Sequence, residues 1–445
     1  MLAQTLYWQK DVAGARRIYE DALLRHPHDT TLRLQYGRML AETKQGTRAE
    51  AILTPLREAA ATRSEADTLL GTIAYWRGDF TRAARLFKEA LGTNPNQPDA
   101  RRQLQQILAG SAPWIRLSSS LRHDDQPLDR LAIGVEAGWF ATPLVPLTIR
   151  LEPLAFRLPD EGVHRLWSAE FAAAGFIPSA RLETEVAGGV LQRVGGVDAV
   201  DWRGRAALGI RLAPGFTLRG RAERAPYLHT ESSITTPVMT DTASGAVHVD
   251  HARGWLGEGS IQAERFPDGN MVTSASGWLL APLVHRDRLK LRAGYAFGMA
   301  NADESRFVLA AASQPYDPAD PRFDTAGRYA PYYTPMNVVT HSLTAAVALH
   351  ARPSAVIRLS GSYALHATED APAFVTSEGQ LQFTTIHRTF SPWKAASAVD
   401  VTIREGLTLG VVGELGRTAF YGWGTADIHL TYRFWNPTAP HASRP

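Results

Sequence analysis

The sequence predicts an α + β multidomain chain, in which N-terminal helical repeats are followed by a transmembrane antiparallel β-barrel of about 16 strands. Three observations support this fold class. Small residues recur every 34 positions in the first hundred residues, and hydrophobic and polar residues alternate with a period of two after Trp114. The alternating segments are about ten residues long, which is the length with which a tilted strand crosses a bilayer.

The 34-residue period is clearest at Ala15, Ala49 and Ala83. This period is the signature of tetratricopeptide repeats, in which small residues let the two helices of a unit approach closely. Pro27 and Pro95 follow the second helix of their units, where proline ends a helix. The residues expected to pack between helices are Ala15, Tyr19, Ala22, Gly37, Ala49, Gly71, Ala83, Phe87 and Ala90.

Residues 1–110 are expected to hold about three such units, with a capping helix at 97–110. The third unit begins near Ser64, and counting back by whole periods places the start of the first unit about five residues before Met1. We therefore expect the chain to be truncated at its start, with upstream repeats and a signal peptide missing. The concave face of a short solenoid commonly holds a peptide or partner protein; a simple spacer is the alternative.

Residues 111–435 form the predicted barrel, and 436–445 a short C-terminal tail. In 131–139, hydrophobic side chains at odd positions alternate with small or polar ones, and 202–212 repeats the pattern. Aromatic residues gather near the strand ends, as in the girdles of membrane barrels. About 20 residues per strand and connection gives roughly 16 strands.

The predicted connections differ in length. The segments 213–215 and 405–406 read as tight turns, whereas 227–246, 314–337 and 366–378 read as long loops. Short turns at one end and long loops at the other are typical of outer-membrane barrels.

Charged residues occupy the polar face of several predicted strands. A soluble sandwich would also show alternation, but a dry core would not tolerate unpaired charges. A wet lumen tolerates them, and we expect these side chains either to offer hydrogen bonds to a transported molecule or to serve solvation and charge pairing alone. The lumen-facing candidates are Arg203, Arg205, Arg211, Arg219, Arg221, Glu223, Lys290, Arg292, Arg358 and Glu414.

Composition excludes several classes of function. The 47 basic and 44 acidic residues give a net charge of +3 without any block of like charges, so nucleic-acid binding is not expected. The chain has no cysteine, which excludes thiol chemistry. No sequence motif of a nucleophile, metalloprotease or nucleotide-binding loop occurs, so we predict no enzyme, no catalytic residue and no cofactor.

Two groups of residues contain side chains that bind metals in other proteins, but neither predicts a metal site. His248 and His251 flank Asp250, but residues three apart on a strand face opposite sides. The acidic segments Asp124–Asp125 and 317–324 could bind calcium, although solvated loops are the simpler interpretation. We therefore predict no metal.

Repeats that run directly into a C-terminal barrel resemble the secretion subunits of exopolysaccharide systems, in particular the outer-membrane C subunit of bacterial cellulose synthase operons. The poly-N-acetylglucosamine exporter shares this plan, and YaiO-like barrels also carry repeats before a barrel. The resemblance rests on the 34-residue frame, on "ERFPDGN" at 264–270, on "YYTPMN" at 332–337 and on the closing strand "IHLTYRFW" at 428–435.

The resemblance implies a bacterial outer-membrane channel that exports a cellulose-like or related glycan, with the repeats in the periplasm. Its implied partners are the exopolysaccharide chain, outer-membrane lipid, and periplasmic or inner-membrane synthase proteins bound by the repeats. The alternatives are a non-conducting anchor, adhesion or assembly protein, a YaiO-like barrel of unassigned role, and a barrel enzyme acting on lipid or polysaccharide.

Overall fold

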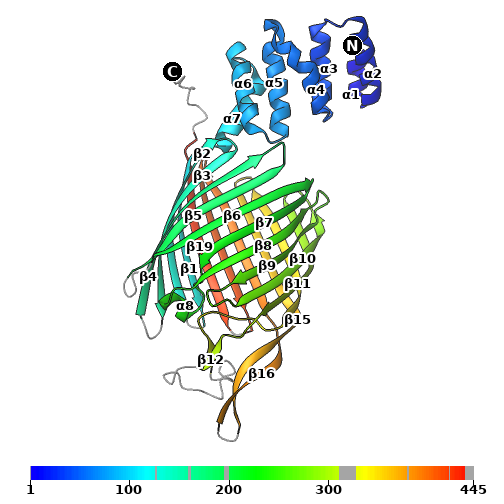
Figure 1. Cartoon of the computed structure of the whole chain (residues 1–445). Helices are drawn as coiled ribbons and strands as arrows, with labels where there is room; N and C mark the ends of the chain where they lie inside the picture. The colour runs from blue at the N-terminus through cyan, green and yellow to red at the C-terminus, as the bar shows by residue number, and fades with distance from the viewer. Residues whose placement is uncertain are drawn as a thin grey trace.

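The computed structural model describes residues 2–125, 128–158, 162–194, 200–309, 327–377, 380–419 and 421–435. A stack of helices leads into a barrel of strands (Figure 1). The helices of the stack are α1 (Leu2–Trp8), α2 (Val12–Arg25), α3 (Thr30–Glu42), α4 (Gly46–Leu53), the 3-10 helix η1 (Thr54–Arg57), α5 (Ala60–Trp76), α6 (Phe80–Thr93) and α7 (Pro98–Gly110). Within the described residues, no helix has both the length and the apolar character needed to cross a membrane.

Aspartates begin three of these helices. The side chains of Asp11, Asp29 and Asp79 accept hydrogen bonds from the backbone N–H three residues on, at 2.8, 2.9 and 3.0 Å. These bonds satisfy amide groups that have no partner within the helix. The helix starts are therefore fixed by single residues in the turns between helices.

The small residues of the repeat lie where helices meet. A Cβ atom on Gly71 would lie 2.6 Å from the Phe87 ring, and one on Gly37 would lie 2.5 Å from a methyl carbon of Leu53. Glycine is therefore required for the close contacts of α5 with α6 and of α3 with α4. The remaining predicted packing residues are buried except Ala22, which is half-buried: Ala15, Tyr19, Ala49, Ala83, Phe87 and Ala90.

The strands of the barrel follow α7 after a short connection at 111–113. They are β1 (Trp114–Asp124), β2 (Leu128–Thr142), β3 (Val145–Leu158), β4 (Gly162–Ile177), β5 (Leu182–Val194), β6 (Val200–Ala213), β7 (Phe216–Pro226), β8 (Met239–Asp250), β9 (Leu256–Arg265), β10 (Met271–His285), β11 (Leu289–Ala302), β14 (Val338–Arg352), β15 (Ala355–Ser377), β16 (Gln380–Phe390), β17 (Trp393–Arg404), β18 (Leu407–Arg417) and β19 (Gly422–Arg433). The described connections also hold α8 (Glu231–Thr235), β12 (Phe307–Leu309) and β13 (Gly327–Tyr329).

The barrel is closed and has 16 strand positions. The last strand, β19, pairs with the first, β1, from Trp114–Arg433 to Asp124–Trp423. The long strand β15 pairs with β17 through its first half and with β16 through its second, so β16 and β17 together fill one position. The predicted fold class, helical repeats followed by an antiparallel barrel of about 16 strands, is confirmed.

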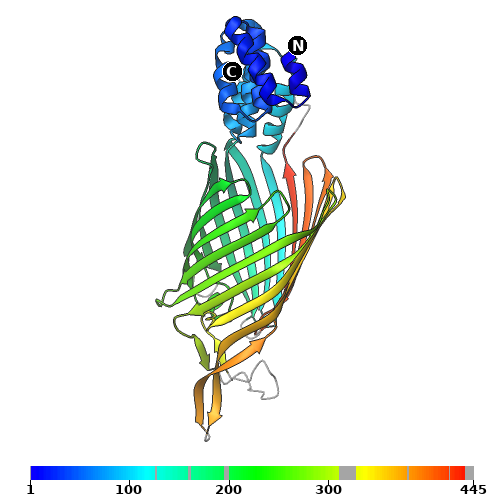
Figure 2. The same ribbon diagram turned by 90° about the vertical axis from the view of Figure 1, so that its right-hand side faces the viewer.

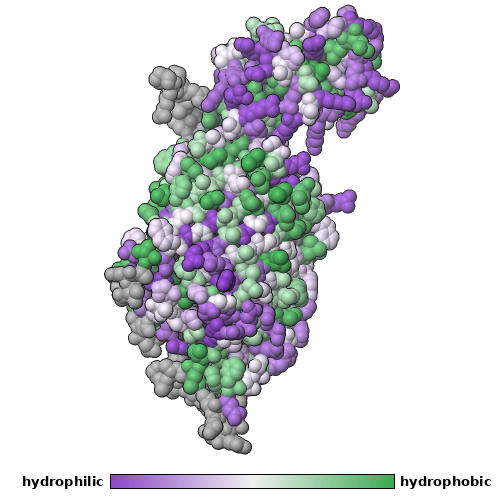
Figure 3. Space-filling model, in the orientation of Figure 1, coloured by the Kyte–Doolittle hydropathy of each residue, from purple (hydrophilic) through white to green (hydrophobic). Residues whose placement is uncertain are grey.

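Each strand has an apolar and a polar face. On β6, Trp202 and Leu208 are exposed, whereas Arg203 and Arg205 point to the opposite side of the sheet. We call the side that carries the exposed hydrophobic residues the apolar face and the other side the polar face. In Figure 3, hydrophobic side chains cover much of the barrel and hydrophilic ones dominate the helical stack.

The two ends of the barrel differ. Tight turns lie at the end that carries the helices, which we call the helical end; Gly215 and Gly406 have positive φ angles of 82° and 78° there. The opposite end, which we call the loop end, carries α8, the β12–β13 hairpin and the β15–β16 hairpin, which projects beyond the barrel (Figures 1 and 2).

Two predicted loops are wrong in extent. The second half of 227–246 belongs to β8, which begins at Met239, and 366–377 belongs to β15. Both stretches consist largely of small residues, so their side chains show little contrast between hydrophobic and polar positions. Of the loop predicted at 314–337, only 327–337 is described, and the predicted tail at 436–445 lies outside the described residues.

Candidate functional site

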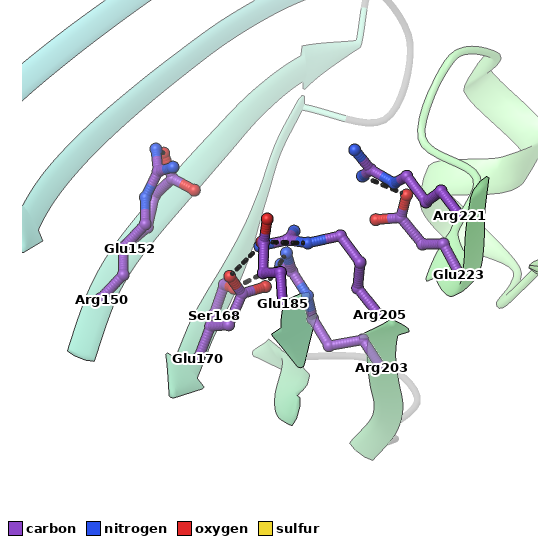
Figure 4. Close-up of polar contacts among 9 residues, drawn as sticks. All are labelled: Arg150, Glu152, Ser168, Glu170, Glu185, Arg203, Arg205, Arg221 and Glu223. Atoms are coloured by element: carbon purple, nitrogen blue, oxygen red, sulfur yellow. Dashed lines mark hydrogen bonds and ion pairs between the residues drawn. The ribbon is translucent and has the colours of Figure 1, made fainter. Parts of the chain in front are cut away.

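The polar face of β4, β5 and β6 carries a network of charges (Figure 4). Arg203 contacts Glu170 at 2.5 Å and Ser168 at 2.9 Å, and Arg205 contacts Glu185 at 2.6 Å. Arg205 also approaches Glu170 at 3.4 Å, so one carboxylate serves two guanidinium groups. Two guanidinium groups therefore balance the negative charge of the Glu170 carboxylate through charge-assisted hydrogen bonds.

The sequence of β5 makes this network possible. Gly189 lies between Arg203 and Glu170 in the ladder of three strands. Because glycine has no side chain, the guanidinium group of Arg203 can cross β5 and reach the carboxylate on β4. The strand order and one glycine therefore join residues that are 33 positions apart.

Most of the other predicted lumen candidates also lie in ion pairs. Arg211 contacts Glu183 at 2.5 Å and Lys394 contacts Glu414 at 2.9 Å. Arg221 is paired with Glu223, and Arg358 with Asp400. The guanidinium of Arg292 instead donates to the carbonyl of Gly254 at 2.8 Å. Within the described residues Arg219 and Lys290 form no ion pair.

The short helix α8 packs against the polar face at the loop end. Its Ile234 is only 1% exposed, and Arg193 of β5 donates to its carbonyl. A capping box between Thr230 and Ser233 fixes the start of the helix. The hydrophobic residues around Ile234 come from β2 to β5 and are Leu128, Phe156, Leu158, Leu166 and Leu191.

A second loop lies beside α8. Tyr332 stacks on Phe266 with ring centroids 3.5 Å apart, and its hydroxyl donates to Asp268 at 2.6 Å. Burial raises the pKa of Asp268, but hydrogen bonds from Tyr332 and Arg306 outweigh it and lower the pKa below its usual value. Thr230 donates to the carbonyl of Pro331, so the two loops are joined to each other.

A hollow of about 530 Å³ lies between these loops and the polar faces of β14, β15, β17 and β19. Burial, with help from Arg122 and Arg130, lowers the pKa of His229 to about 4, so this imidazole is neutral at pH 7. The Trp423 ring has the Arg122 guanidinium at 5.3 Å and the Lys394 amine at 5.6 Å from its centroid. The aromatic lining of this chamber, which we call the aromatic chamber, is Tyr227, His229, Tyr329, Tyr333, Phe390, Trp393, Tyr421 and Trp423.

Sequence reasoning missed the aromatic chamber and the docking of α8. The run "YAPYY" at 329–333 is an aromatic signal, but nothing local shows that it folds against strands. The second signal is the presence of hydrophobic residues, such as Phe156 and Leu166, at polar-face positions of β3 and β4. These residues indicate that something apolar, here Ile234 of α8, packs on that face.

The histidines and aspartates of the two possible metal sites lie in other contacts. His248 lies on β8 with Nδ1 3.5 Å from Glu258, and His251 lies in the following turn. Asp124 is buried beside Arg122, and Asp125 accepts the N–H of Gly422 at 2.9 Å. The described residues contain no group of three side chains able to hold a metal ion, and 317–324 lies outside them.

Comparison with known proteins matches the two parts separately. The tetratricopeptide repeat family matches residues 6–73. The fold is similar to a bacterial polysaccharide outer membrane secretin, with 10% identity, a TM-score of 0.55, and coverage of 73% of this chain and 99% of that one. Weaker matches include CdiB from Acinetobacter baumannii, at 9% identity over 72% of this chain and 60% of that one, with a TM-score of 0.40. The CymD monoaromatic hydrocarbon channel matches at 10% identity over 76% and 92%, with a TM-score of 0.39. The search of curated proteins found no match to the sequence.

These findings define a class of protein. The chain joins tetratricopeptide-type helices to a closed 16-stranded antiparallel barrel whose fold is similar to that of a bacterial polysaccharide outer membrane secretin. Its polar face carries paired charges, and its loop end holds the aromatic chamber.

Proposed function

We propose that this protein is an outer-membrane channel that exports an exopolysaccharide, and that the polar face of its strands lines the lumen. The observation that carries the proposal is the aromatic chamber. Aromatic rings offer flat apolar surfaces on which the faces of sugar rings can rest, and neighbouring hydroxyl and amine groups can bond to sugar hydroxyls. The similarity to a polysaccharide secretin supports the same substrate class.

The charges on the polar face favour a neutral, cellulose-like glycan over a strongly charged one. Arg203, Arg205 and Lys394 each lie beside a carboxylate, so these stretches of the wall offer hydrogen bonds but little net charge. A transported chain must bind weakly at many sites in order to keep moving. Paired charges suit this requirement because neither partner is free to hold an ionic ligand tightly.

We also propose that the loop end faces the outside of the cell and that the helices lie in the periplasm. Short turns at the periplasmic end and larger loops outside are the general pattern of outer-membrane barrels. In this orientation the helical stack lies at the entrance of the barrel, where its Gly78 approaches Phe176 at the rim of β4. The repeats would there bind periplasmic or inner-membrane synthase proteins.

Single-channel recording in planar bilayers tests the channel. We expect discrete openings that uncharged cello-oligosaccharides block transiently, with weaker block by charged oligosaccharides of equal length. Trp423→Ala removes one ring of the chamber and should shorten the blocking time about fivefold, because an aromatic contact contributes about 1 kcal/mol. Trp202→Ala, on the apolar face, is the matched control and should change nothing. Equal blocking times in all three proteins would contradict the proposal.

A second candidate is a plugged barrel that anchors the repeats and conducts nothing. The burial of Ile234 against the leucines of β3 to β5 favours it, since α8 would then act as a permanent seal. Recordings without any opening, including recordings from a variant in which α8 is loosened, would select the anchor over the channel.

A further inference from the structure

A row of charges crosses the apolar face near the loop end. Asp241 on β8 lies opposite Arg224 of β7 on one side and opposite Arg265 of β9 on the other. Arg224 donates to both carboxylate oxygens of Asp241, at 2.8 and 3.0 Å. Arg265 forms no ion pair among the described residues, so the row presents more positive than negative charge outward.

The row lies near the loop-end edge of the barrel wall, where the hydrocarbon of a membrane around the barrel would give way to headgroups. Arg224 is two residues from the end of β7, and Arg265 is the last residue of β9. Trp202, which is 73% exposed on the same face, lines one surface hollow together with Arg224 and Arg265. Tryptophan is typical of the interface between lipid tails and headgroups. In Figure 3, hydrophilic side chains interrupt the hydrophobic surface toward the loop ends of these strands.

Small residues form a hollow beside the row. It measures about 770 Å³, and its floor includes Gly204, Ala206, Ala222, Ala243 and Ala263. A second hollow of about 500 Å³ shares Ala243 and Ala263 and continues along β8, β9 and β10 past Gly245 and Ala275. The surface therefore combines a basic row at the headgroup level with an apolar trough that runs toward the middle of the wall.

We propose that this surface is a binding site for a phosphorylated glycolipid of the leaflet at the loop end. The phosphate would lie beside the guanidinium groups of Arg224 and Arg265, which match it in charge and in hydrogen-bond geometry. One acyl chain would fill the trough over Ala222 and Ala243. The inference rests on the proposed placement of the barrel in a membrane and is independent of what the channel carries.

Native mass spectrometry of the full chain in detergent tests the site, with lipid A as the probe and phosphatidylethanolamine and inorganic phosphate as comparisons. We expect one tightly bound lipid A and much weaker binding of the other two. R224Q combined with R265Q should weaken lipid A binding at least about tenfold, because charge-assisted bonds to the phosphate are lost. Ala222→Leu should weaken it as well, although it leaves every charge in place.

The matched control is R157Q combined with R165Q. These arginines lie on the apolar face at the loop end, and their substitution removes the same net charge. The surface beside them has no trough of small residues, because the exposed side chains of Trp167 and Leu151 occupy it. Unchanged binding in this control and reduced binding in the first two variants would support the site. Equal losses in both double variants, no loss in either, or tight binding of inorganic phosphate would overturn it. Conductance should be normal in all variants, so a failed channel and a failed lipid site are distinguishable.

Discussion

Shortening the side chain of Ile234 tests whether α8 controls the opening of the barrel. Ile234 is almost fully buried among Phe156, Leu158, Leu166 and their neighbours. Ile→Ala changes at buried sites cost about 2–5 kcal/mol through lost burial and the cavity left behind. For this five-residue helix on the polar face, we take the loss in docking free energy as about 3 kcal/mol. This loss raises the population of undocked α8 about 100-fold. Ile234→Val removes one carbon and should raise it only about fivefold.

The assay is single-channel conductance of the three proteins at pH 7. We expect open time to increase in the order wild type, Ile234→Val, Ile234→Ala, while the conductance of the open state stays constant. Because both variants keep the barrel strands intact, resistance of the folded protein to heat in detergent serves as the control for folding. Identical open times in all three proteins, with folding intact, would refute the idea that this cluster holds the barrel closed.

Three further changes test other parts of the structure. Because the pKa of His229 is about 4 when docked and 6.5 when free, protonation favours undocking. Docking should therefore weaken as the pH falls from 6.5 to 4, to an extent reduced by solvent screening, and the open time should rise in wild type but not in His229→Phe. Gly71→Ala should destabilise the repeats by about 1–3 kcal/mol and lower their Tm in circular dichroism, whereas Gly92→Ala, which meets nothing within 4 Å, should raise it slightly. Glu170→Gln removes the carboxylate that two arginines share and leaves their positive charge uncompensated. The reversal potential of the channel should therefore shift toward anion selectivity. An unchanged reversal potential would place these residues outside the ion path.

The sequence was informative wherever the chain repeats a short pattern. The 34-residue spacing of Ala15, Ala49 and Ala83 reflects helix crossings that recur in every unit, and the structure buries all three completely. The alternation of Trp202 and Leu208 with Arg203 and Arg205 reflects the two faces of one strand. The alternation depends on neighbouring residues, and the repeat depends on a regular spacing. A single sequence is therefore enough to reveal both.

Features that depend on distant contacts left no such pattern. The segment that forms α8 is five residues long, and what holds it is packing against β2 to β5, including Leu128 about a hundred residues earlier. The second half of β15 consists largely of small residues, so its two faces differ little in polarity. Its partner β16 forms a hairpin with it beyond the barrel and does not add a seventeenth strand position. Neither outcome follows from local propensity, since each is fixed by which strand or loop is available to pair.

The position of the aromatic chamber connects the two loops with the proposed export of a glycan. Its rings come from both loops, from the β18–β19 connection and from β16, β17 and β19, so undocking α8 would also move His229, which directly precedes the helix, relative to Trp423. A glycan that enters from the helical end would meet paired charges along the polar face before it reaches these rings. Sugar rings that stack on Trp423 and Tyr421 would then compete with the loop residues for the same surface. Under the proposed function, binding of the transported chain would therefore open the barrel, so block by oligosaccharides and the open time should change together in the Ile234 variants.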